Sequence, residues 1–357
     1  MKLLHLLYSG QGGLGTYFMN FADSDQPRQF EHHVIFYGIE PLFNEYEVYC
    51  RQRAIPFIYV NRGSKVDLHA YRQVNHYRKM NTIDAVLIHT VSLSPFYFFS
   101  FRRSFRVIAF DHTSGAFKTR IEWAFAALNH LLADFAIYFY EGQFGIIKKK
   151  WPFLRRGKNT LIIPKEVDTS FFKPAVPPAS NRQFTLGISS RLVAGKRHDL
   201  LVEAIRKLKE KDIHVHLRIA GEGPLHQPLT KQVQNDQLED QVFFEGSLTR
   251  ERMVHFYQSL DAYIHATNSE TICYSIKEAQ ATGLPIIASD VEGVKNEIDH
   301  RVSGLLFKNT ADDIVSSIME VMNNESLRLK LARQSLLLST TKRKGNAAQL
   351  YKALVKK

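Results

Sequence analysis

Short hydrophobic runs alternate with amphipathic or mixed segments along almost the whole chain of 357 residues. In the first half, seven of these runs are typical of buried β-strands, at 2–8, 32–38, 56–60, 85–90, 106–112, 135–141 and 160–164. Nearly continuous apolar strands separated by helices indicate a parallel sheet that helices cover on both faces. This half of the chain is therefore predicted to form a doubly wound α/β domain.

A stretch that contains several prolines, KPAVPPASNRQ at 173–183, interrupts the alternation and indicates a linker. The alternation then resumes with six strand candidates, FTLGISS, VHLRIAG, VFFEGS, AYIHAT, PIIASD and GLLF. We predict two doubly wound Rossmann-like domains that face each other across a cleft where the ligand binds. The expected bounds are 1–170, 171–183 for the linker and 184–341, with a C-terminal helix at 342–357 completing the first domain.

The composition describes a soluble globular protein, because 45% of the residues are hydrophobic and 23% are charged. Two cysteines, Cys50 and Cys273, give no disulfide framework and suit a reducing compartment. The apolar run at the N-terminus is too short for a signal peptide, and no stretch is long and apolar enough to span a membrane. These features predict a cytoplasmic protein.

The net charge of +12 resides in one region, since residues 51–158 alone carry an excess of 12 basic residues over acidic ones. Within it, PFYFFSFRRSFR (95–106) and KKKWPFLRRGK (148–158) interleave aromatic and basic residues. A solvated basic face or nucleic-acid binding would each explain the charge. The added aromatic residues favour an anionic membrane surface, to which each basic residue contributes about 1 kcal/mol. We therefore expect a peripheral location on the inner face of the cell membrane.

The first strand ends in SGQGGLGT, which contains the G-x-G-x-x-G pattern of phosphate-binding loops. An NAD(P)-dependent oxidoreductase is therefore an alternative function. That fingerprint also requires an acidic residue at the end of the second strand, to hold a ribose. Here the second strand ends in Tyr37 and Gly38, and Glu40 lies beyond it. The loop indicates a phosphate or sugar contact, or a plain tight turn.

Two cations, Arg191 and Lys196, lie in the loop that leaves the first strand of the second domain, in GISSRLVAGKRHDLLVEA. Ordinary loop charges are common, but two cations beside a helix N-terminus suit a diphosphate. Further on, Glu270 and Glu278 flank the start of a helix. One interpretation is a charge at the helix dipole plus a solvated glutamate, and the other is a site that binds sugar hydroxyls.

Four segments together, SRLVAGKRHDLLVEA, IAGEGPL, VFFEGS and SETICYSIKEAQATGLPIIASDVEGVKNEI, resemble the retaining family-four glycosyltransferases of the GT-B fold, which include enzymes of bacterial cell-surface polysaccharides. The hallmark is a glutamate pair with seven residues between, then a small-residue helix, G-x-P-[IV]-[IV]-A-[ST] and a glycine-containing loop. The matching positions are Glu270, Glu278, Gly283, Pro285 and Gly293. The resemblance covers most of 184–307, and in the first half mainly the glycine-rich loop and FDHTSG.

The resemblance implies donor-binding roles for both glutamates and both cations. Glu278 should accept hydrogen bonds from the nucleotide ribose, and Glu270 should face the donor sugar. Arg191 and Lys196 should neutralise the diphosphate leaving group. The sugar and phosphate should also meet the backbone amides of Thr271, Ile272, Cys273, Tyr274 and Ser275, where many relatives carry Gly-Phe-Gly.

Further contacts are implied at the base, the phosphates and the reacting carbon. The nucleobase should be lined by Phe244 and Leu248, and the phosphates and acceptor by Gly13 and Gly15. His112, in AFDHTSG, matches the histidine placed over the anomeric carbon of the sugar. Because His89 also ends a strand, it is a second candidate for that position. Glu270 and His112 are the predicted catalytic residues.

No metal or other cofactor is expected. Asp23-Ser-Asp25 has the letters of a metal-binding Asp-x-Asp motif, but it follows the first helical segment and is expected to be a solvated loop. His214 and His216 have no third ligand in the sequence. Lysine and arginine should take the place of a divalent cation at the diphosphate.

The predicted function is retaining, metal-independent transfer of a hexose from a nucleotide-diphosphate sugar by front-face substitution. A UDP-sugar is favoured and GDP-mannose comes second. The expected acceptor is a glycan or lipid-linked saccharide of surface polysaccharide synthesis, such as lipopolysaccharide or capsule. A nucleic-acid-binding protein would leave Glu270 and Glu278 unexplained, so no nucleic-acid partner is expected.

Overall fold

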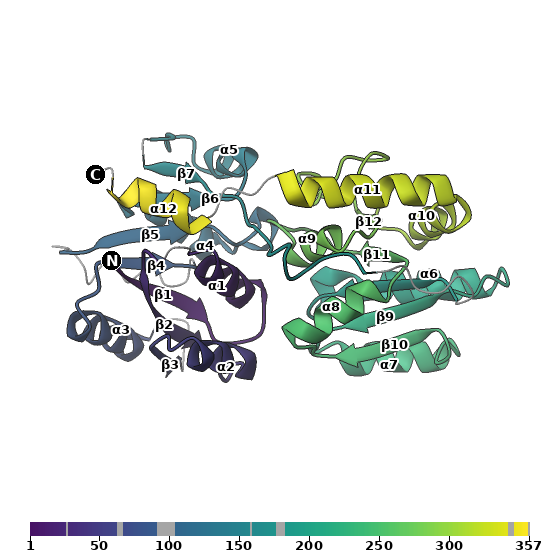
Figure 1. The fold of residues 1–357 in the computed structure, drawn as a ribbon, viewed down its shortest axis with the longest axis horizontal. Coiled ribbons are helices and arrows are strands. Elements are labelled where there is room, and N and C mark those ends of the chain that lie inside the picture. Colours follow the sequence, from purple (N-terminus) through teal and green to yellow (C-terminus); the bar gives the residue numbers. More distant parts are fainter. Residues whose placement is uncertain are drawn as a thin grey trace. The chain divides into compact units, whose positions relative to one another are not determined.

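A computed structural model describes residues 1–25, 28–62, 67–90, 104–157, 159–175, 183–341 and 346–355. The chain divides into two compact units, Met1–Lys165 with Lys344–Lys357, and Glu166–Arg343 (Figure 1). Since the second unit begins at Glu166, the stretch predicted as a linker, 171–183, starts inside that unit. Of that stretch, residues 176–182 lie outside the described part of the chain.

The first unit is built on a parallel sheet of seven strands in the order β3-β2-β1-β4-β5-β6-β7. Its strands are β1 Lys2–Tyr8, β2 Glu31–Gly38, β3 Phe57–Asn61, β4 Ala85–Ile88, β5 Arg106–Phe110, β6 Phe135–Tyr138 and β7 Thr160–Ile162. Its helices are α1 Gly13–Asp23, α2 Asn44–Gln52, α3 Leu68–Met80, α4 Arg120–Leu132, α5 Glu141–Lys150 and α12 Asn346–Val355. The central strands are buried on both faces, which explains their continuous apolar sequences.

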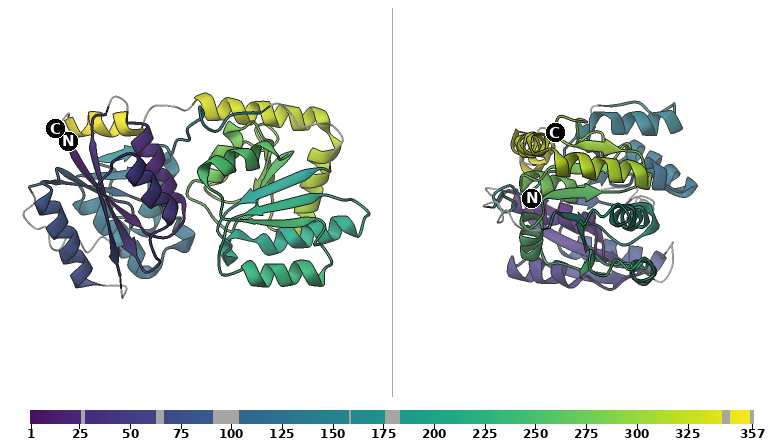
Figure 2. Two further views of the ribbon diagram at one scale, coloured as in Figure 1. Left: turned by 60° about the horizontal axis from the view of Figure 1, so that its bottom comes forward. Right: turned by 90° about the vertical axis from the view of Figure 1, so that its right-hand side faces the viewer.

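The last helix, α12, belongs to the first unit although it follows the second in sequence. It packs beside α1 (Figures 1 and 2), and the Tyr351 ring meets the Phe30 ring edge-on at 5.6 Å. The Ala347 amide donates a hydrogen bond to Ser24 Oγ at 3.4 Å. Within α12, Ala347, Leu350 and Leu354 are buried.

The second unit is built on a parallel sheet of six strands in the order β10-β9-β8-β11-β12-β13. Its strands are β8 Thr185–Ser189, β9 His216–Ala220, β10 Val242–Gly246, β11 Ala262–His265, β12 Ile286–Ser289 and β13 Leu305–Phe307. Its helices are α6 His198–Lys209, α7 His226–Asn235, α8 Arg250–Gln258, α9 Tyr274–Ala281, α10 Ala311–Asn323 and α11 Glu325–Thr341. Helix α10 packs against α6, and α11 packs against α9 (Figure 1).

Every hydrophobic run predicted as a strand contains one, and both sheets are parallel, so the predicted alternation is confirmed. One local expectation is wrong. Asp25 was expected in a solvated loop, but it is buried, and its carboxylate is satisfied there by the backbone N–H groups of Gln29 and Phe30, each at 3.0 Å. Among the helices of the described residues, none combines the length and the hydropathy that crossing a bilayer requires.

Candidate active site

A glycine turn after β9 holds the loop that carries Arg191. The Leu192 amide donates to the Glu222 carbonyl at 2.9 Å. A Cβ on Gly223 would lie 2.5 Å from the Leu192 carbonyl oxygen, so only glycine allows this close approach. The segment GEGPL therefore supports the loop after β8, and Arg191 itself is exposed.

Lys196 and Glu270, predicted as separate donor contacts, are brought together by the fold. Lys196 ends a short 3-10 turn, Ala194–Lys196, and its Nζ contacts Glu270 Oε1. Glu270 lies in the loop between β11 and α9. Gly293 packs against that loop with a φ of +89°, and a Cβ there would lie 2.0 Å from the Glu270 carbonyl oxygen. The predicted Gly293 match thus has a physical reason.

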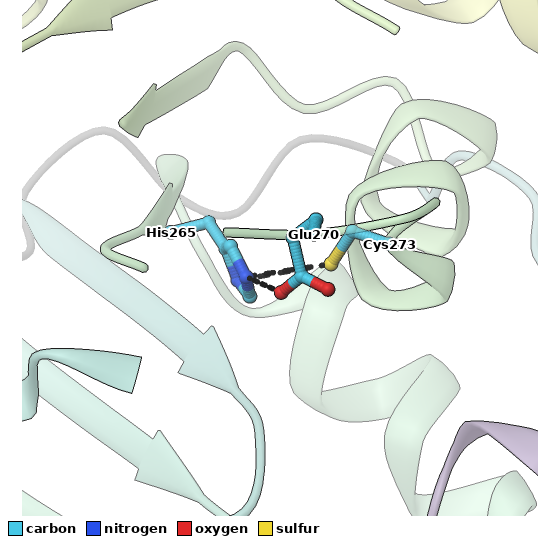
Figure 3. Close-up of side chains that lie close together, drawn as sticks. All are labelled: His265, Glu270 and Cys273. Carbon is cyan, nitrogen blue, oxygen red and sulfur yellow. Dashed lines mark hydrogen bonds and ion pairs between the residues drawn. The ribbon is translucent and has the colours of Figure 1, made fainter. Parts of the chain in front are cut away.

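His265 and Cys273 complete a cluster with Glu270 (Figure 3). His265 Nε2 lies 2.9 Å from Glu270 Oε1 and 3.4 Å from Cys273 Sγ. Cys273 Sγ is also 3.1 Å from Ser275 Oγ. The sequence prediction missed His265, although its place at the end of a buried strand, AYIH, was a usable signal.

The cluster shifts the pKa values of its members in ways that favour charged groups. Burial alone would raise the pKa of Glu270, but the charges of Lys196 and His265 lower it to about 2. Burial alone would lower the pKa of His265, yet Cys273 and Glu270 raise it to about 9. The pKa of the Cys273 thiol is lowered, because the nearby imidazolium outweighs burial. A carboxylate therefore contacts an imidazolium and an ammonium group, and the imidazolium also contacts the Cys273 sulfur.

The same side chains form a possible metal site. One ligand atom from each of His265, Glu270 and Cys273 lies within 4.8 Å of the others, a donor set that soft divalent cations accept. The Lys196 ammonium already contacts the Glu270 carboxylate and supplies a positive charge there. The expected absence of a metal stays a prediction.

Glu278 is not a solvated glutamate, because it lies on the buried side of α9 with 8% of its surface exposed. The Tyr257 hydroxyl donates a hydrogen bond to Glu278 Oε2 at 2.8 Å. Burial, followed by the charge of Glu278, raises the pKa of Tyr257 well above its usual value. Tyr257 was not predicted, since nothing in the sequence pairs it with Glu278. The ribose contact of Glu278 stays a prediction.

The other predicted donor contacts of the second unit lie at element ends. Helix α9 begins at Tyr274 with Cys273 as its N-cap, three residues after Glu270. Four of these residues, Thr271, Ile272, Cys273 and Tyr274, are buried, and Ser275 is partly buried. Phe244 lies in β10, and the centre of its ring is 5.1 Å from that of the His226 ring. Leu248 follows β10 and is buried.

In the first unit, packing explains part of the glycine-rich loop. Helix α1 begins at Gly13. A Cβ on Gly15 would lie 2.0 Å from the Tyr46 ring, so glycine lets the helix approach that side chain. The Tyr46 hydroxyl in turn donates to the Gly12 carbonyl at 2.8 Å. The phosphate contacts of Gly13 and Gly15 stay predictions.

His112 and His89, the two candidates for the reacting centre, are in contact. His89 Nδ1 lies 3.1 Å from His112 Nε2. His89 is 1% exposed, whereas His112 is only partly buried, so His112 is the more accessible of the two. Burial and the charge of Lys165 lower the pKa of His89 to about 3 and that of His112 well below its usual value. Both imidazoles are therefore neutral.

Residues 170–336 match the family model described as "Glycosyl transferases group 1". The chain is 30% identical over 165 residues to a subunit of phosphatidylinositol N-acetylglucosaminyltransferase from Arabidopsis thaliana, and the match covers 46% of this chain and 37% of that protein. It is 33% identical over 138 residues to alpha-monoglucosyldiacylglycerol synthase of Streptococcus pneumoniae, covering 37% of this chain and 31% of that protein. The matched segments thus span about a third of the length of these relatives.

Solved structures resemble the whole chain. HepE of Anabaena in complex with UDP and glucose superposes with a TM-score of 0.83 at 17% identity, covering 100% of both chains. Sucrose-phosphate synthase from Thermosynechococcus elongatus gives a TM-score of 0.82 at 15% identity, again over 100% of both chains. At these identities the likeness shows the fold, which is GT-B with two Rossmann-like domains, as predicted.

Proposed function

Residues 170–336 belong to the group 1 glycosyltransferases and the chain has the GT-B fold, and from this we propose that it transfers a sugar from a nucleotide-diphosphate sugar. The observation that carries the proposal is the contact of Lys196 with Glu270, in the loop that leads into the N-terminus of α9. A cation and a carboxylate near the backbone amides of a helix N-terminus are a combination that suits a sugar diphosphate.

The proposed chemistry follows the charges that the reaction develops. When the bond between sugar and diphosphate breaks, negative charge grows on the phosphate and positive charge on the sugar ring. Arg191, Lys196 and the amides at the start of α9 stabilise the phosphate, in place of a metal ion. Glu270 faces the sugar and steadies its positive charge, and the His265 imidazolium keeps Glu270 ionised. The sugar then transfers on the same face with retention.

The favoured donor is a UDP-sugar, with GDP-mannose second. Support comes from HepE, whose structures hold UDP with glucose and UDP-glucose. Glu278 would accept hydrogen bonds from the ribose, and Phe244 and Leu248 would lie at the base.

The proposed acceptor is a lipid-linked saccharide or glycan at the inner membrane face, in surface polysaccharide synthesis. The names of both quoted relatives refer to lipids, phosphatidylinositol and monoglucosyldiacylglycerol. After α5, Phe153 is 63% exposed and follows three exposed lysines, Lys148 to Lys150. Of the other predicted membrane stretch, 95–106, residues 95–103 lie outside the described residues.

The membrane contact is tested by sedimentation with anionic vesicles at low salt. We expect the chain to bind, and a Phe153→Ser variant with Lys148, Lys149 and Lys150 changed to Ser to bind several-fold less. Equal binding of the two proteins would contradict the membrane contact and leave the donor proposal intact.

The donor proposal is tested by a thermal-shift panel of UDP, GDP, ADP and NAD. A ligand at 100 times its Kd stabilises a protein by roughly 2.7 kcal/mol. We expect a shift with UDP or GDP that Arg191→Ala and Glu278→Ala abolish. Lys277→Ala is the matched control, because Lys277 also lies on α9 and pairs with Glu297 at 2.5 Å. A shift with NAD alone would favour the oxidoreductase.

A further inference from the structure

Three side chains of different chemistry converge within the segment 265–273 (Figure 3). His265 ends strand β11, Glu270 lies in the loop after it, and Cys273 is the N-cap of α9. One ligand atom of each lies within 4.8 Å of the other two. A nitrogen, an oxygen and a sulfur atom therefore face one point, although only the oxygen has a role in the proposed sugar transfer.

The spacing of these atoms is close to what a tetrahedral metal centre requires. Zinc lies about 2.0–2.2 Å from nitrogen and oxygen ligands and about 2.3 Å from sulfur, so the ligands of one ion lie roughly 3.3–3.7 Å apart. His265 Nε2 is 3.4 Å from Cys273 Sγ and 2.9 Å from Glu270 Oε1. Small side-chain rotations would therefore bring the three atoms to one ion.

The surroundings of His265 also suit a metal ligand. Its other ring nitrogen, Nδ1, lies 3.2 Å from the Tyr263 hydroxyl oxygen, and metal-binding histidines usually make such a second contact. An imidazole nitrogen and a thiolate sulfur prefer zinc and similar soft ions, whereas Mg²⁺ and Ca²⁺ prefer oxygen ligands alone. The three ligand atoms thus select a class of metal ion.

Lys196 would compete with such an ion. Its ammonium group contacts Glu270 Oε1, the same oxygen that faces His265. A divalent ion brings two positive charges and displaces two, the Nε2 proton of the His265 imidazolium and the Lys196 ammonium. With Cys273 as the thiolate, the exchange leaves the total charge of the cluster unchanged. Lys196 has room to leave, because its side chain is long, flexible and 21% exposed.

The burial of the cluster does not prevent this exchange. An incoming ion needs no open ligand atom, because it replaces contacts that the three side chains make with one another and with Lys196. Its path is the side of Lys196 and Glu270, whose side chains are partly exposed, whereas His265 is fully buried. Movement of the lysine side chain would therefore admit the ion and free its ligand together.

We propose that His265, Glu270 and Cys273 form an inhibitory site for a soft divalent cation such as Zn²⁺, which replaces the Lys196 ammonium at Glu270. The inhibition rests on the proposed function, in which Lys196 neutralises the diphosphate and Glu270 faces the sugar. A bound ion occupies the carboxylate and moves the ammonium away, so the nucleotide sugar loses both contacts. The chain would then transfer sugar without a metal and be blocked by a thiophilic one.

Titration of the full-length chain with Cd²⁺ tests the site without any nucleotide, because a cadmium–thiolate bond absorbs in the ultraviolet. Cys50→Ser is the parent protein, so that Cys273 is the only thiol. We expect absorbance that saturates at one ion per chain, and His265→Gln in this background should weaken binding by at least about tenfold. The control is His214→Gln, because His214 also pairs with a carboxylate, that of Asp212 at 3.6 Å, outside the cluster.

Lys196→Ala gives the sharpest test, because it should improve binding. Without the ammonium, the ion has no competitor for Glu270 Oε1, and we expect Cd²⁺ to bind several-fold more tightly to the same parent carrying this change. General damage to the fold would weaken binding instead. No saturable absorbance in the parent, or equal binding by His265→Gln, overturns the site. Equal or weaker binding by a folded Lys196→Ala overturns the exchange.

The nucleotide thermal shift tests the inhibition. With UDP or GDP in excess, we expect one equivalent of Zn²⁺ to reduce the shift of the wild type several-fold but to leave that of Cys273→Ser unchanged, and Mg²⁺ should not reduce either. A wild-type shift that Zn²⁺ leaves unchanged or increases overturns the inhibitory role. No shift even without metal would contradict the proposed function and the inhibition with it, while the Cd²⁺ absorbance still decides the metal site.

Discussion

The two units bury histidines at equivalent places but give them different charges, since one imidazole is neutral and the other is positive. His89 follows a central strand of the first sheet and His265 ends a central strand of the second, with exposed fractions of 1% and 0%. The pKa of His89 is lowered to about 3 by burial and Lys165, whereas Cys273 and Glu270 outweigh burial and raise that of His265 to about 9. Neighbouring groups, more than depth, therefore decide the charge of a buried imidazole.

The pKa values of the two cysteines differ between the units in the same way. Burial raises the pKa of Cys50 in the first unit to about 12, and the charge of Arg53 opposes that effect only in part. Cys273 is also buried, yet the His265 imidazolium lowers the pKa of its thiol. The described part of the second unit thus concentrates ionised groups around Glu270, while the first surrounds His112 with neutral rings.

The largest expected effect comes from removing the cation of the second unit. In Lys196→Ala, Glu270 loses its ammonium partner, and the proposed diphosphate loses a neutralising cation. We expect kcat to fall on the order of 10² to 10³, as for other groups that stabilise developing charge, in a sugar-transfer assay. Lys277→Ala should retain most of the activity, because Lys277 pairs with Glu297 and not with Glu270. Equal losses in both variants would show that α9 had been disturbed.

A second variant, Glu270→Gln, removes the charge of Glu270 and keeps a side chain of nearly the same size. Since the folded pKa of about 2 lies below the ordinary value of 4.5, ionised Glu270 stabilises the protein above pH 4.5, and this contribution is lost as the pH falls through 2. Between these values the free energy of unfolding should fall by about 3 kcal/mol more in the wild type than in Glu270→Gln. Denaturant unfolding at several pH values measures this free energy for both proteins. If it falls with pH by the same amount in the wild type and in Glu270→Gln, the charged cluster is contradicted.

The sequence was sufficient for the sheets, but not for the side-chain networks. Strands such as 2–8 were predictable because both faces are buried and the run is continuously apolar. Lys196 and Glu270 were recognised by motif. Their mutual contact and the Tyr257 bond to Glu278 depend on distances between elements that are separated in sequence. A His on an apolar strand gives no sign of its charge.

A smaller effect distinguishes the two thiols. Cys50→Ser retains only Cys273, and Cys273→Ser retains only Cys50. Below pH 9.0, the ordinary pKa of a thiol, we expect thiolate absorbance in the ultraviolet from the first variant and none from the second, because only Cys273 has a cationic neighbour that outweighs burial. If the thiolate absorbance of both variants rises at the same pH, the two cysteines do not differ in pKa as the account requires.

The smallest expected effect is that of metal removal. If Lys196 and Arg191 replace a divalent cation, dialysis against EDTA should change kcat by less than about twofold, as measured in the same transfer assay. A loss restored by one added metal ion would instead assign His265, Glu270 and Cys273 to that ion.

The most direct measurement is the release of nucleoside diphosphate from UDP-, GDP-, ADP- and dTDP-sugars in the presence of a lipid extract. The account predicts that the wild type releases the diphosphate of one donor with transfer of its sugar, and that Lys196→Ala does so at least about a hundredfold more slowly. A folded wild type that releases no diphosphate from any of these donors would contradict it.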